Sequence, residues 1–208
     1  LEQPMAAAIG ADLPINEPVG NLVIDIGGGT TETAVISLGG IVALEAVRVG
    51  SFDIDAAIQS YVRREHGLAI GERTAEEIKI SIGSAMATSE DRDAEVRGRD
   101  LVSGLPKTVV LTSSEIRVAI DDVVTQMVNS VIRCLASAPP ELSQDFLTRG
   151  MYLVGGGSML RGLARRIERD TQVPVNMSTE PLEAVVLGAG HCVENFAALR
   201  GLFMDSRR

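Results

Sequence analysis

Short apolar stretches interrupted by glycine dominate the beginning of the chain. Residues 22–26 form an apolar run broken by one aspartate, residues 32–38 alternate between apolar and polar side chains, and residues 41–49 continue after Gly39 and Gly40. Short alternating or apolar runs separated by glycine are typical of β-strands. The pattern therefore predicts three consecutive strands joined by tight turns.

The spacing of apolar residues becomes helical in the next section. Residues 52–67 place their apolar side chains on one helical face and end at Gly67, a favourable residue just beyond a helix. A second helix is predicted over residues 74–85, where Thr74 and Glu77 have the spacing of a capping box. The charged stretch that follows contains strand-like runs at 94–97 and 108–111, as a small α+β insertion would.

A long amphipathic helix is predicted next, with Ser114 as its N-cap and Pro139-Pro140 as its end. Its apolar stripe consists of Ile116, Ile120, Val123, Met127, Val131 and Leu135. Beyond it the sequence predicts a buried strand, a triple-glycine turn, a helix to residue 171, a strand at 173–177 and a last helix over 181–199.

In order, these elements read β-β-β-α, an insertion, and then α-β-α-β-α. Three hairpin-joined strands followed by β-α-β crossovers predict an α/β fold, a mixed sheet covered by helices on both faces. We expect residues 1–50 and 113–208 to build this main domain and residues 51–112 to form the inserted small one. Such sheets bind ligands at the carboxyl ends of their strands.

Composition excludes several function classes. No run approaches the roughly 18 apolar residues of a membrane-spanning helix, so a soluble domain is expected. A net charge of −9 argues against nucleic acid as a partner, because binding to the phosphate backbone requires clustered lysine and arginine. Cys134 and Cys192 are predicted to be buried free thiols in a reducing compartment. The start of the chain, without an initiator methionine, reads like the middle of a longer protein.

The first glycine turn, residues 27–31, joins the first two predicted strands. Its glycines allow backbone N–H groups to approach an anion, and its two threonines add hydroxyl donors for phosphate oxygens. These residues are Gly27, Gly28, Gly29, Thr30 and Thr31. Asp25, at the end of the strand, is placed to hold water ligands of Mg²⁺ or to orient an attacking water. The alternative is a tight hairpin in which the aspartate only bonds its own turn.

The second glycine turn, residues 155–158, follows the buried strand after the long helix. It comprises Gly155, Gly156, Gly157 and Ser158 and is predicted to pass straight into a helix, whose N-terminus contributes positive partial charge. An ordinary strand–helix joint is the alternative. Because the derived topology puts both turns at matching ends of neighbouring strands, together they predict a nucleotide site. Neither turn has the spacing of a Walker A loop or of a Rossmann fingerprint.

With this topology and both turns, the sequence resembles the actin-like ATPase superfamily and, within it, the bacterial MreB family. The resemblance runs from residue 2 to about residue 196 and includes segments specific to that family. They are "EQPMAAAIGADLPINEP", "VIDIGGGTTETAVISLGGIV", "TAEEIKISIGSA", "EVRGRDL", "APPEL", "LVGGGSMLRGL" and "EPLEAVVLGAG". The resemblance implies a ribonuclease H-like mixed sheet, the second of the two such subdomains of an actin fold.

The resemblance also implies roles for individual residues. It makes 25–31 the second phosphate loop and 155–158 the adenosine loop, and it gives catalytic roles to Asp25, Gln3 and Thr30, with Mg²⁺ held by Asp25 through water. It makes one helix face flank the adenosine of bound ATP, with Glu76 and Lys79 as the stronger candidates among Glu76, Glu77, Ile78 and Lys79. From the residues alone, Glu76 and Lys79 read as a solvated helical pair.

Three departures from the family pattern stand out. The first phosphate loop and the other wall of the nucleotide cleft are absent from these residues. Gln3 stands where the family usually has a glutamate, and an amide orients water but accepts no proton. Ser51 and Phe52 replace a glycine and an aspartate.

The leading hypothesis is an ATP-binding and ATP-hydrolysing cytoskeletal filament subunit that determines cell shape by organising peptidoglycan synthesis. The resemblance implies that it assembles with itself and with membrane-bound cell-elongation proteins, in the cytoplasm at the inner face of the membrane. Membrane contact itself is expected outside this part of the chain. Two alternatives stay open: a kinase or chaperone ATPase on the same fold, and a catalytically weak module that binds or caps filaments.

Overall fold

Two β-sheets organise the chain in the computed structural model, which describes residues 1–89 and 91–196. The larger sheet has the strand order β3-β2-β1-β7-β8 and the smaller one β4-β5-β6. The strands of the larger sheet are β1 (Asn21–Ile26), β2 (Thr31–Ser37), β3 (Gly40–Val47), β7 (Met151–Val154) and β8 (Val175–Met177). Those of the smaller sheet are β4 (Leu68–Ala69), β5 (Asp93–Asp100) and β6 (Pro106–Thr112).

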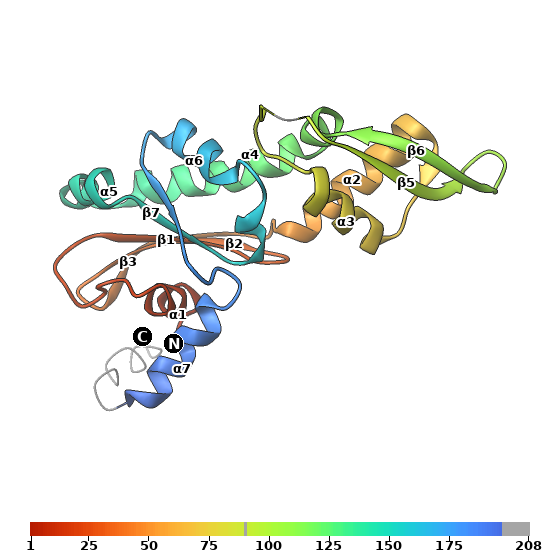
Figure 1. The fold of residues 1–208 in the computed structure, drawn as a ribbon. Coiled ribbons are helices and arrows are strands. Elements are labelled where there is room, and N and C mark those ends of the chain that lie inside the picture. The colour runs from red at the N-terminus through yellow and green to blue at the C-terminus, as the bar shows by residue number, and fades with distance from the viewer. Residues whose placement is uncertain (90, 197–208) are drawn as a thin grey trace.

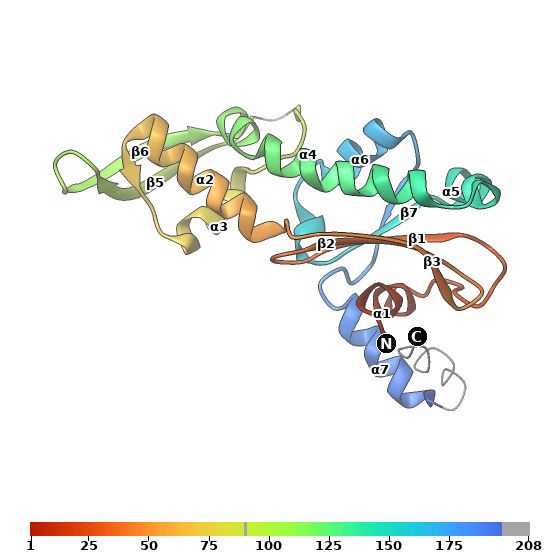
Figure 2. The same cartoon turned by 180° about the vertical axis from the view of Figure 1, so that it is seen from behind.

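Helices cover both faces of the larger sheet, as the sequence predicted (Figures 1 and 2). On one face lie α1 (Gln3–Gly10) and α7 (Ala184–Glu194), and on the other α4 (Ser113–Ser137), α5 (Ser143–Arg149) and α6 (Leu163–Thr171). β1 is central because it pairs with β2 on one side, antiparallel, and with β7 on the other, parallel. All six of its residues are buried. The result is the mixed sheet of the expected α/β fold.

The helices α1 and α7 touch backbone to backbone where they cross. A Cβ on Gly10 would lie 1.8 Å from the carbonyl oxygen of Ala184, and one on Gly188 would lie 1.8 Å from that of Ala6. No side chain larger than hydrogen fits at either place, which explains why glycine occurs inside α7 despite its low helix propensity. The predicted continuation of this helix to residue 199 lies partly outside the described residues.

The smaller sheet packs with α2 (Ser51–His66) and α3 (Glu72–Ile82). As predicted, α2 ends at Gly67, whose φ of 61° is the left-handed conformation of a helix C-cap. The far end of α2 is tied to the β5–β6 hairpin, because Leu101 N donates to Gly67 O at 2.8 Å and Lys107 Nζ donates to His66 O at 3.2 Å.

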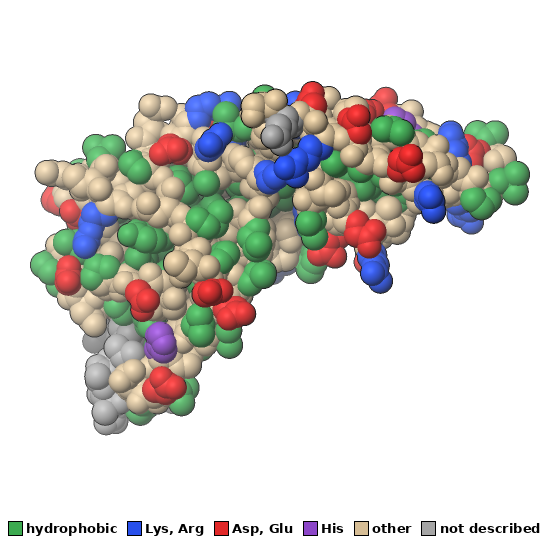
Figure 3. Space-filling model, viewed as in Figure 1, with side chains coloured by type: hydrophobic (Ala, Val, Ile, Leu, Met, Phe, Trp, Pro, Cys, Tyr) green, Lys and Arg blue, Asp and Glu red, His purple; other side chains and the backbone are tan. Residues whose placement is uncertain are grey.

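The β5–β6 hairpin ends in an apolar tip whose turn is hydrogen-bonded to Asp100. Asp100 Oδ1 accepts hydrogen bonds from the backbone of Val102 and Ser103 and from the Ser103 hydroxyl, at 2.8 to 3.0 Å. Leu101, Val102 and Leu105 are nevertheless exposed, Val102 to 96%. Figure 3 shows these hydrophobic side chains at the end of the molecule farthest from the larger sheet.

Two predicted helix caps were wrong. α4 is capped by Thr112, whose hydroxyl accepts from Glu115 N while Glu115 Oε2 accepts from Thr112 N, so Ser114 lies inside the helix. The true capping box begins two residues earlier because β6 runs directly into α4. The predicted stripe of α4 is confirmed, with Ile116, Ile120, Met127 and Val131 fully buried.

The second wrong cap is that of α3, which has no capping box. Gly71 is its N-cap and makes no side-chain cap bond, so the helix begins two residues before Thr74. Glu77 forms a surface ion pair with Arg73 at 3.1 Å instead of reaching back to the helix start.

The second glycine turn does not pass straight into a helix. A 3-10 turn covers Gly156–Met159, and α6 begins only at Leu163, after Gly162. The predicted contribution of a helix N-terminus at this turn was therefore wrong. The eight-residue α1, the seven-residue α5 and the two-residue β4 were not predicted either. Within the described residues, no helix is both long and apolar enough to cross a membrane.

Candidate functional site

The two glycine turns leave the same edge of the larger sheet. β1 and β7 are parallel neighbours in a register that pairs Asp25 with Val154, so the first turn and the second turn follow adjacent strand ends. The second turn packs against the end of β1, from which the first turn follows: a Cβ on Gly155 would lie 2.4 Å from Ile26 O and 2.5 Å from Asp25 Oδ1. The predicted juxtaposition of the turns is confirmed, and it depends on glycine at position 155.

Asp25 lies at the centre of this edge and is 3% exposed. Gln3, in the first turn of α1, donates from Nε2 to Asp25 Oδ2 at 2.8 Å. Burial raises the pKa of Asp25 because a charged carboxylate loses hydration, and the bond from Gln3 partly offsets this increase. The structure thus brings together two of the predicted catalytic residues.

Glu32 belongs to the same edge and was missed by sequence reasoning. It pairs with Asp25 across the β1–β2 hairpin. Burial raises the pKa of Glu32 most, followed by the negative charges of Asp25 and Glu2. Counting outward from the glycines along both strands would have found it, because residues at equal distance from a hairpin turn lie opposite each other.

The residues of the first glycine turn divide into structural and accessible groups. Thr31 is fully buried and its hydroxyl donates to Val49 O at 2.8 Å, while Gly27 N donates to Thr30 O at 2.9 Å. Gly29 is exposed, with no atom within 4 Å of the position that a Cβ would occupy, and Thr30 is partly exposed. The donors that remain for an anion are therefore those of Gly28, Gly29 and Thr30.

The N-terminus of α2 holds the first glycine turn in place. Ser51 N donates to Gly27 O at 3.0 Å and Phe52 N donates to Gly28 O at 2.8 Å. The Phe52 ring covers Gly28, since a Cβ there would lie 2.6 Å from the ring, yet Phe52 remains 68% exposed. The residue that departs from the family pattern thus lies directly on the turn that was expected to hold phosphate.

The second glycine turn is mostly internal. Gly157 and Ser158 are buried, and the Ser158 hydroxyl donates to Gly155 O at 2.6 Å. Gly155 is partly exposed and Gly156 is exposed. Only these two glycines of the predicted adenosine loop present their backbone at the surface.

The predicted helix face on α3 separates into three environments. Ile78 is 3% exposed and belongs to the core, and Glu77 lines a separate hollow with Thr74 and Val96. Glu76 is exposed next to α2. The structure therefore brings Glu76, but not Glu77 or Ile78, to the side of α3 that faces α2.

Lys79 is committed to an ion pair that the sequence did not indicate. Its Nζ lies 2.9 Å from Asp55 Oδ2 and 3.3 Å from Ser51 O. The two side chains are only 12% and 10% exposed. No spacing rule reveals this pair, because Asp55 and Lys79 lie on different helices.

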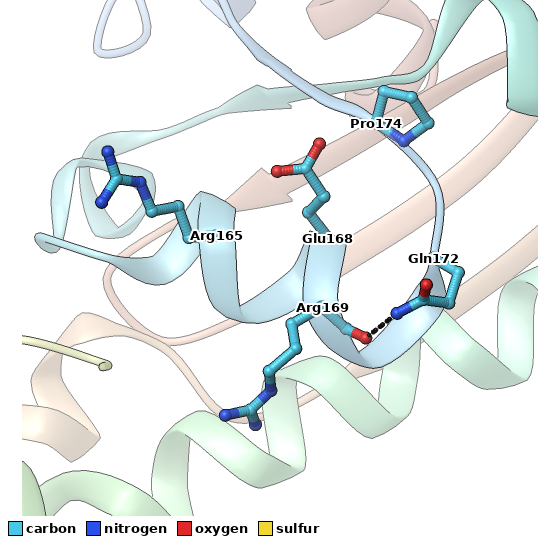
Figure 4. A pocket seen from close by; sticks show the side chains of 5 residues that line it. All are labelled: Arg165, Glu168, Arg169, Gln172 and Pro174. Carbon is cyan, nitrogen blue, oxygen red and sulfur yellow. Dashed lines mark hydrogen bonds between the residues drawn. The ribbon is translucent and has the colours of Figure 1, made fainter. Parts of the chain in front are cut away.

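Besides the hollow that Glu77 lines, one hollow lies beside the first glycine turn and another lies away from it. One of about 590 Å³ is lined by Phe52, Asp55, Ala56, Gln59, Glu72, Arg73 and Glu76, between α2 and α3. Another of about 430 Å³ lies on α6 and includes none of the predicted residues. In Figure 4, Gln172 folds back to donate to Arg169 O at 2.6 Å in this second hollow.

The donor set fits a nucleotide and Mg²⁺. Backbone N–H groups at a turn without Cβ atoms suit phosphate oxygens. Asp25 and Glu32 provide two carboxylates, and Mg²⁺ usually takes one or two together with water and phosphate. In the described part of the chain, no group of three or more His, Cys, Asp or Glu could hold a metal ion without such help.

Comparisons with known proteins agree with this fold. The model of the MreB/Mbl protein family matches residues 1–201. The cell shape-determining protein MreB of Escherichia coli (strain K12) is 50% identical over 194 residues, 93% of this chain and 56% of that protein. The cell shape-determining protein Mbl of Bacillus subtilis (strain 168) is 41% identical over 198 residues, 95% of this chain and 60% of that protein.

A solved structure is also similar. The crystal structure of MreB5 of Spiroplasma citri bound to ADP superimposes with a TM-score of 0.91 at 35% sequence identity, covering 98% of this chain and 61% of that one. The chain thus spans between 56% and 61% of the length of these relatives.

Proposed function

Because the chain belongs to the MreB/Mbl family, we propose that it binds and hydrolyses ATP as part of a cytoskeletal filament subunit that determines cell shape. The observation that carries this proposal is that two glycine turns follow adjacent strand ends beside Asp25, with the amide of Gln3 bound to its carboxylate. Two curated relatives are named as cell shape-determining proteins, and the similar Spiroplasma citri structure is bound to ADP.

Each residue of the edge has a proposed task. The N–H groups of Gly28 and Gly29 and the hydroxyl of Thr30 would bind phosphate oxygens. Mg²⁺, when bound, would neutralise charge that develops on the phosphates. Asp25 would hold water ligands of this ion, and its partner Gln3 would orient the attacking water through its amide. Since an amide accepts no proton, proton acceptance at this edge falls to the carboxylates of Asp25 and Glu32.

A division into two subdomains is part of the proposal. Residues 51–112 would form the small subdomain, supported by their separate three-stranded sheet. Residues 1–50 and 113–208 would form the ribonuclease H-like subdomain that carries both glycine turns. Nucleotide bound at the first turn would then also touch the small subdomain, because α2 begins there.

Assembly and location follow from the family and are proposed with it. Copies of the protein would associate into filaments and engage membrane-bound cell-elongation proteins that organise peptidoglycan synthesis. The filaments would lie in the cytoplasm against the inner face of the membrane. The family match does not favour the kinase or chaperone alternative.

Nucleotide binding is the first test. Isothermal titration with Mg²⁺ and AMPPNP should give a saturable signal for this chain, and Asp25→Ala should weaken binding about 10–100-fold, as loss of a group that holds metal-bound water does. Asp122→Ala is the matched control, because Asp122 is an exposed carboxylate on α4. Equal affinity of the two variants would contradict the role of Asp25.

Filament formation is the second test. Ultracentrifuge pelleting with electron microscopy would compare this chain with a chimaera that adds the part of the Escherichia coli relative outside the match. We expect nucleotide-dependent filaments from the chimaera and not from its Asp25→Ala variant. Should the chimaera bind AMPPNP but never pellet, the ATP-binding proposal stands and the filament proposal fails.

A further inference from the structure

One edge of the smaller sheet is only partly covered. β4 has two residues and pairs only with Arg99 and Asp100, at the end of β5. Residues 93–98 of β5 pair with β6 on one side, and no strand of the described chain lies opposite them on the other. A hollow of about 420 Å³ lies at this edge, between β5 and the neighbouring helix α3 (Figures 1 and 2). The sheet therefore ends at an open edge with space beside it.

Hydrogen bonds at the two ends of β5 show which backbone groups point toward this edge. Leu101 N donates to Gly67 O at 2.8 Å, on the side of β4, and Ser113 N donates to Arg92 O at 2.8 Å, on the side of β6. The pairing of β5 with β6 has no register shift between these two places. Because successive residues of an antiparallel strand direct their backbone groups to opposite sides, the N–H and C=O groups of residues 93, 95 and 97 point to the open edge.

The side chains along the edge restrict what can pair with it. Val96 is buried and lines the hollow together with Ile78 of α3, so the side of the sheet that faces α3 is apolar here. Asp93, Glu95 and Arg97 are exposed, and they lie on the opposite face because side chains alternate along a strand. Read along β5, the open edge presents two negative charges followed by one positive charge.

This order of charges selects among strands. Charged side chains on an edge strand discourage unspecific pairing. A strand whose charges are complementary in order is attracted, since directly opposite side chains of unlike charge stabilise a sheet and those of like charge destabilise it. Charge complementarity therefore defines the partner, which needs one acidic residue opposite Arg97 and basic residues opposite Glu95 and Asp93.

We propose that the open edge of β5 binds an extended peptide segment of a partner protein, which adds to the smaller sheet as an antiparallel strand in line with β4. From its N-terminus to its C-terminus, the segment carries an acidic residue and two basic residues, separated by single apolar residues. The first of these apolar residues packs toward Val96 and Ile78. The inference goes beyond the proposed nucleotide function and does not depend on it, because neither glycine turn takes part.

Fluorescence anisotropy with a labelled peptide tests the proposal. The probe is Thr-Val-Glu-Val-Lys-Val-Lys-Thr, and the control peptide, Thr-Val-Lys-Val-Lys-Val-Glu-Thr, has the same composition with the charges in reverse order. We expect the chain to bind the probe saturably and the control about fivefold or more weakly, because two attractive cross-strand pairs become repulsive. Equal binding of the two peptides, or a preference for the control, would overturn the proposed pairing.

Exchanging a charge on each partner assigns the contact to β5. Arg97→Glu should weaken binding of the probe about fivefold, and a peptide with lysine in place of the glutamate should regain that affinity for the variant. Arg63→Glu is the matched control, because Arg63 is an exposed arginine on α2 outside the lining of the hollow. Circular dichroism checks that both variants are folded. If the exchanged peptide gains nothing with Arg97→Glu, the peptide does not lie opposite Arg97.

A change in the peptide backbone distinguishes strand pairing from binding through side chains alone. In the proposed pairing the first lysine of the probe directs its N–H group toward β5, and the valine before it directs its N–H group away. N-methylation of that lysine should weaken binding about fivefold or more, because a hydrogen bond is lost, whereas N-methylation of the valine should change the affinity by less than about twofold. Equal affinities of the two methylated peptides would overturn strand addition.

Two further outcomes would decide against the proposal. Absence of saturable binding of the probe overturns it and leaves the nucleotide proposal standing, since titration with AMPPNP tests that separately. Sedimentation of the chain without peptide tests another occupant. If the chain forms dimers that Arg97→Glu dissociates, a second copy covers the edge and the partner peptide is the wrong assignment.

Discussion

Replacing Gly155 by alanine tests the packing of the second glycine turn against the end of β1. Gly155 has φ 83° and ψ 157°, a conformation that is essentially restricted to glycine. A Cβ at this position would also lie 2.4 Å from Ile26 O and 2.5 Å from Asp25 Oδ1. Both contacts are with atoms of the buried strand β1, so neither can be relieved by rotating a surface side chain.

The expected loss of stability follows from these two effects. The backbone conformation alone costs a non-glycine residue about 1–3 kcal/mol. When the cost of displacing β1 is added, we expect the free energy of unfolding to fall by about 3 kcal/mol in total. A loss of this size lowers the melting temperature of a chain of this length by about 6–12 °C. Nucleotide affinity should fall as well, because the shift moves Asp25.

Thermal unfolding followed by circular dichroism measures the effect. Gly156→Ala is the matched control, since a Cβ there meets only the end of the flexible Leu182 side chain, at 2.9 Å. Gly29→Ala is a second control, because nothing lies within 4 Å of its Cβ position. If the melting temperature of Gly155→Ala lies within the experimental scatter of these controls, Gly155 does not pack against β1 as described and the argument for a joint site fails.

Three further predictions concern titration, capping and thiol reactivity. Burial raises the pKa of Asp25, so the free energy of unfolding of the wild type should fall as pH rises from about 3.8 through the raised pKa. Over the same pH range, urea unfolding should show the free energy of unfolding of Asp25→Asn increasing relative to that of the wild type. Thr112→Ala should lower the free energy of unfolding by about 1 kcal/mol and Ser114→Ala by less than about 0.5, since only Thr112 caps α4; equal losses would contradict this assignment. Burial raises the pKa of Cys134 to about 11 and also raises that of Cys192, so neither thiol should react with Ellman's reagent at mildly alkaline pH until urea unfolds the chain; rapid reaction of the native protein would refute their burial.

Much of the fold could be predicted because its strong signals are local. The three strands before α2 are marked by alternation and by glycine turns, and Gly67 ends α2 at the predicted position. The caps were less predictable, because Thr112 and Ser114 are both good N-cap residues and only the end of β6 decides between them. The seven-residue α5 is too short to show a helical period.

The site was predictable only where the chain brings its parts together through strand order. Asp25 and both glycine turns follow from the topology, whereas Gln3, whose amide donates to Asp25, was predicted only from the resemblance. The Asp55–Lys79 ion pair and the contact of Phe52 with Gly28 were missed because the partners belong to different elements. Contacts between separate helices and loops produce no regular spacing of residues that could be recognised in the sequence.

The helix α2 connects the nucleotide edge to the opposite end of the molecule. Its first turn is hydrogen-bonded to the carbonyls of Gly27 and Gly28, and its last residues are bonded to the β5–β6 hairpin. Its 16 residues make a rod of about 24 Å. A tilt of about 5° at the glycine turn therefore moves the far end by about 2 Å, by the geometry of such a rod. Because α2 is hydrogen-bonded at both ends, it couples the position of the first glycine turn to that of the apolar tip.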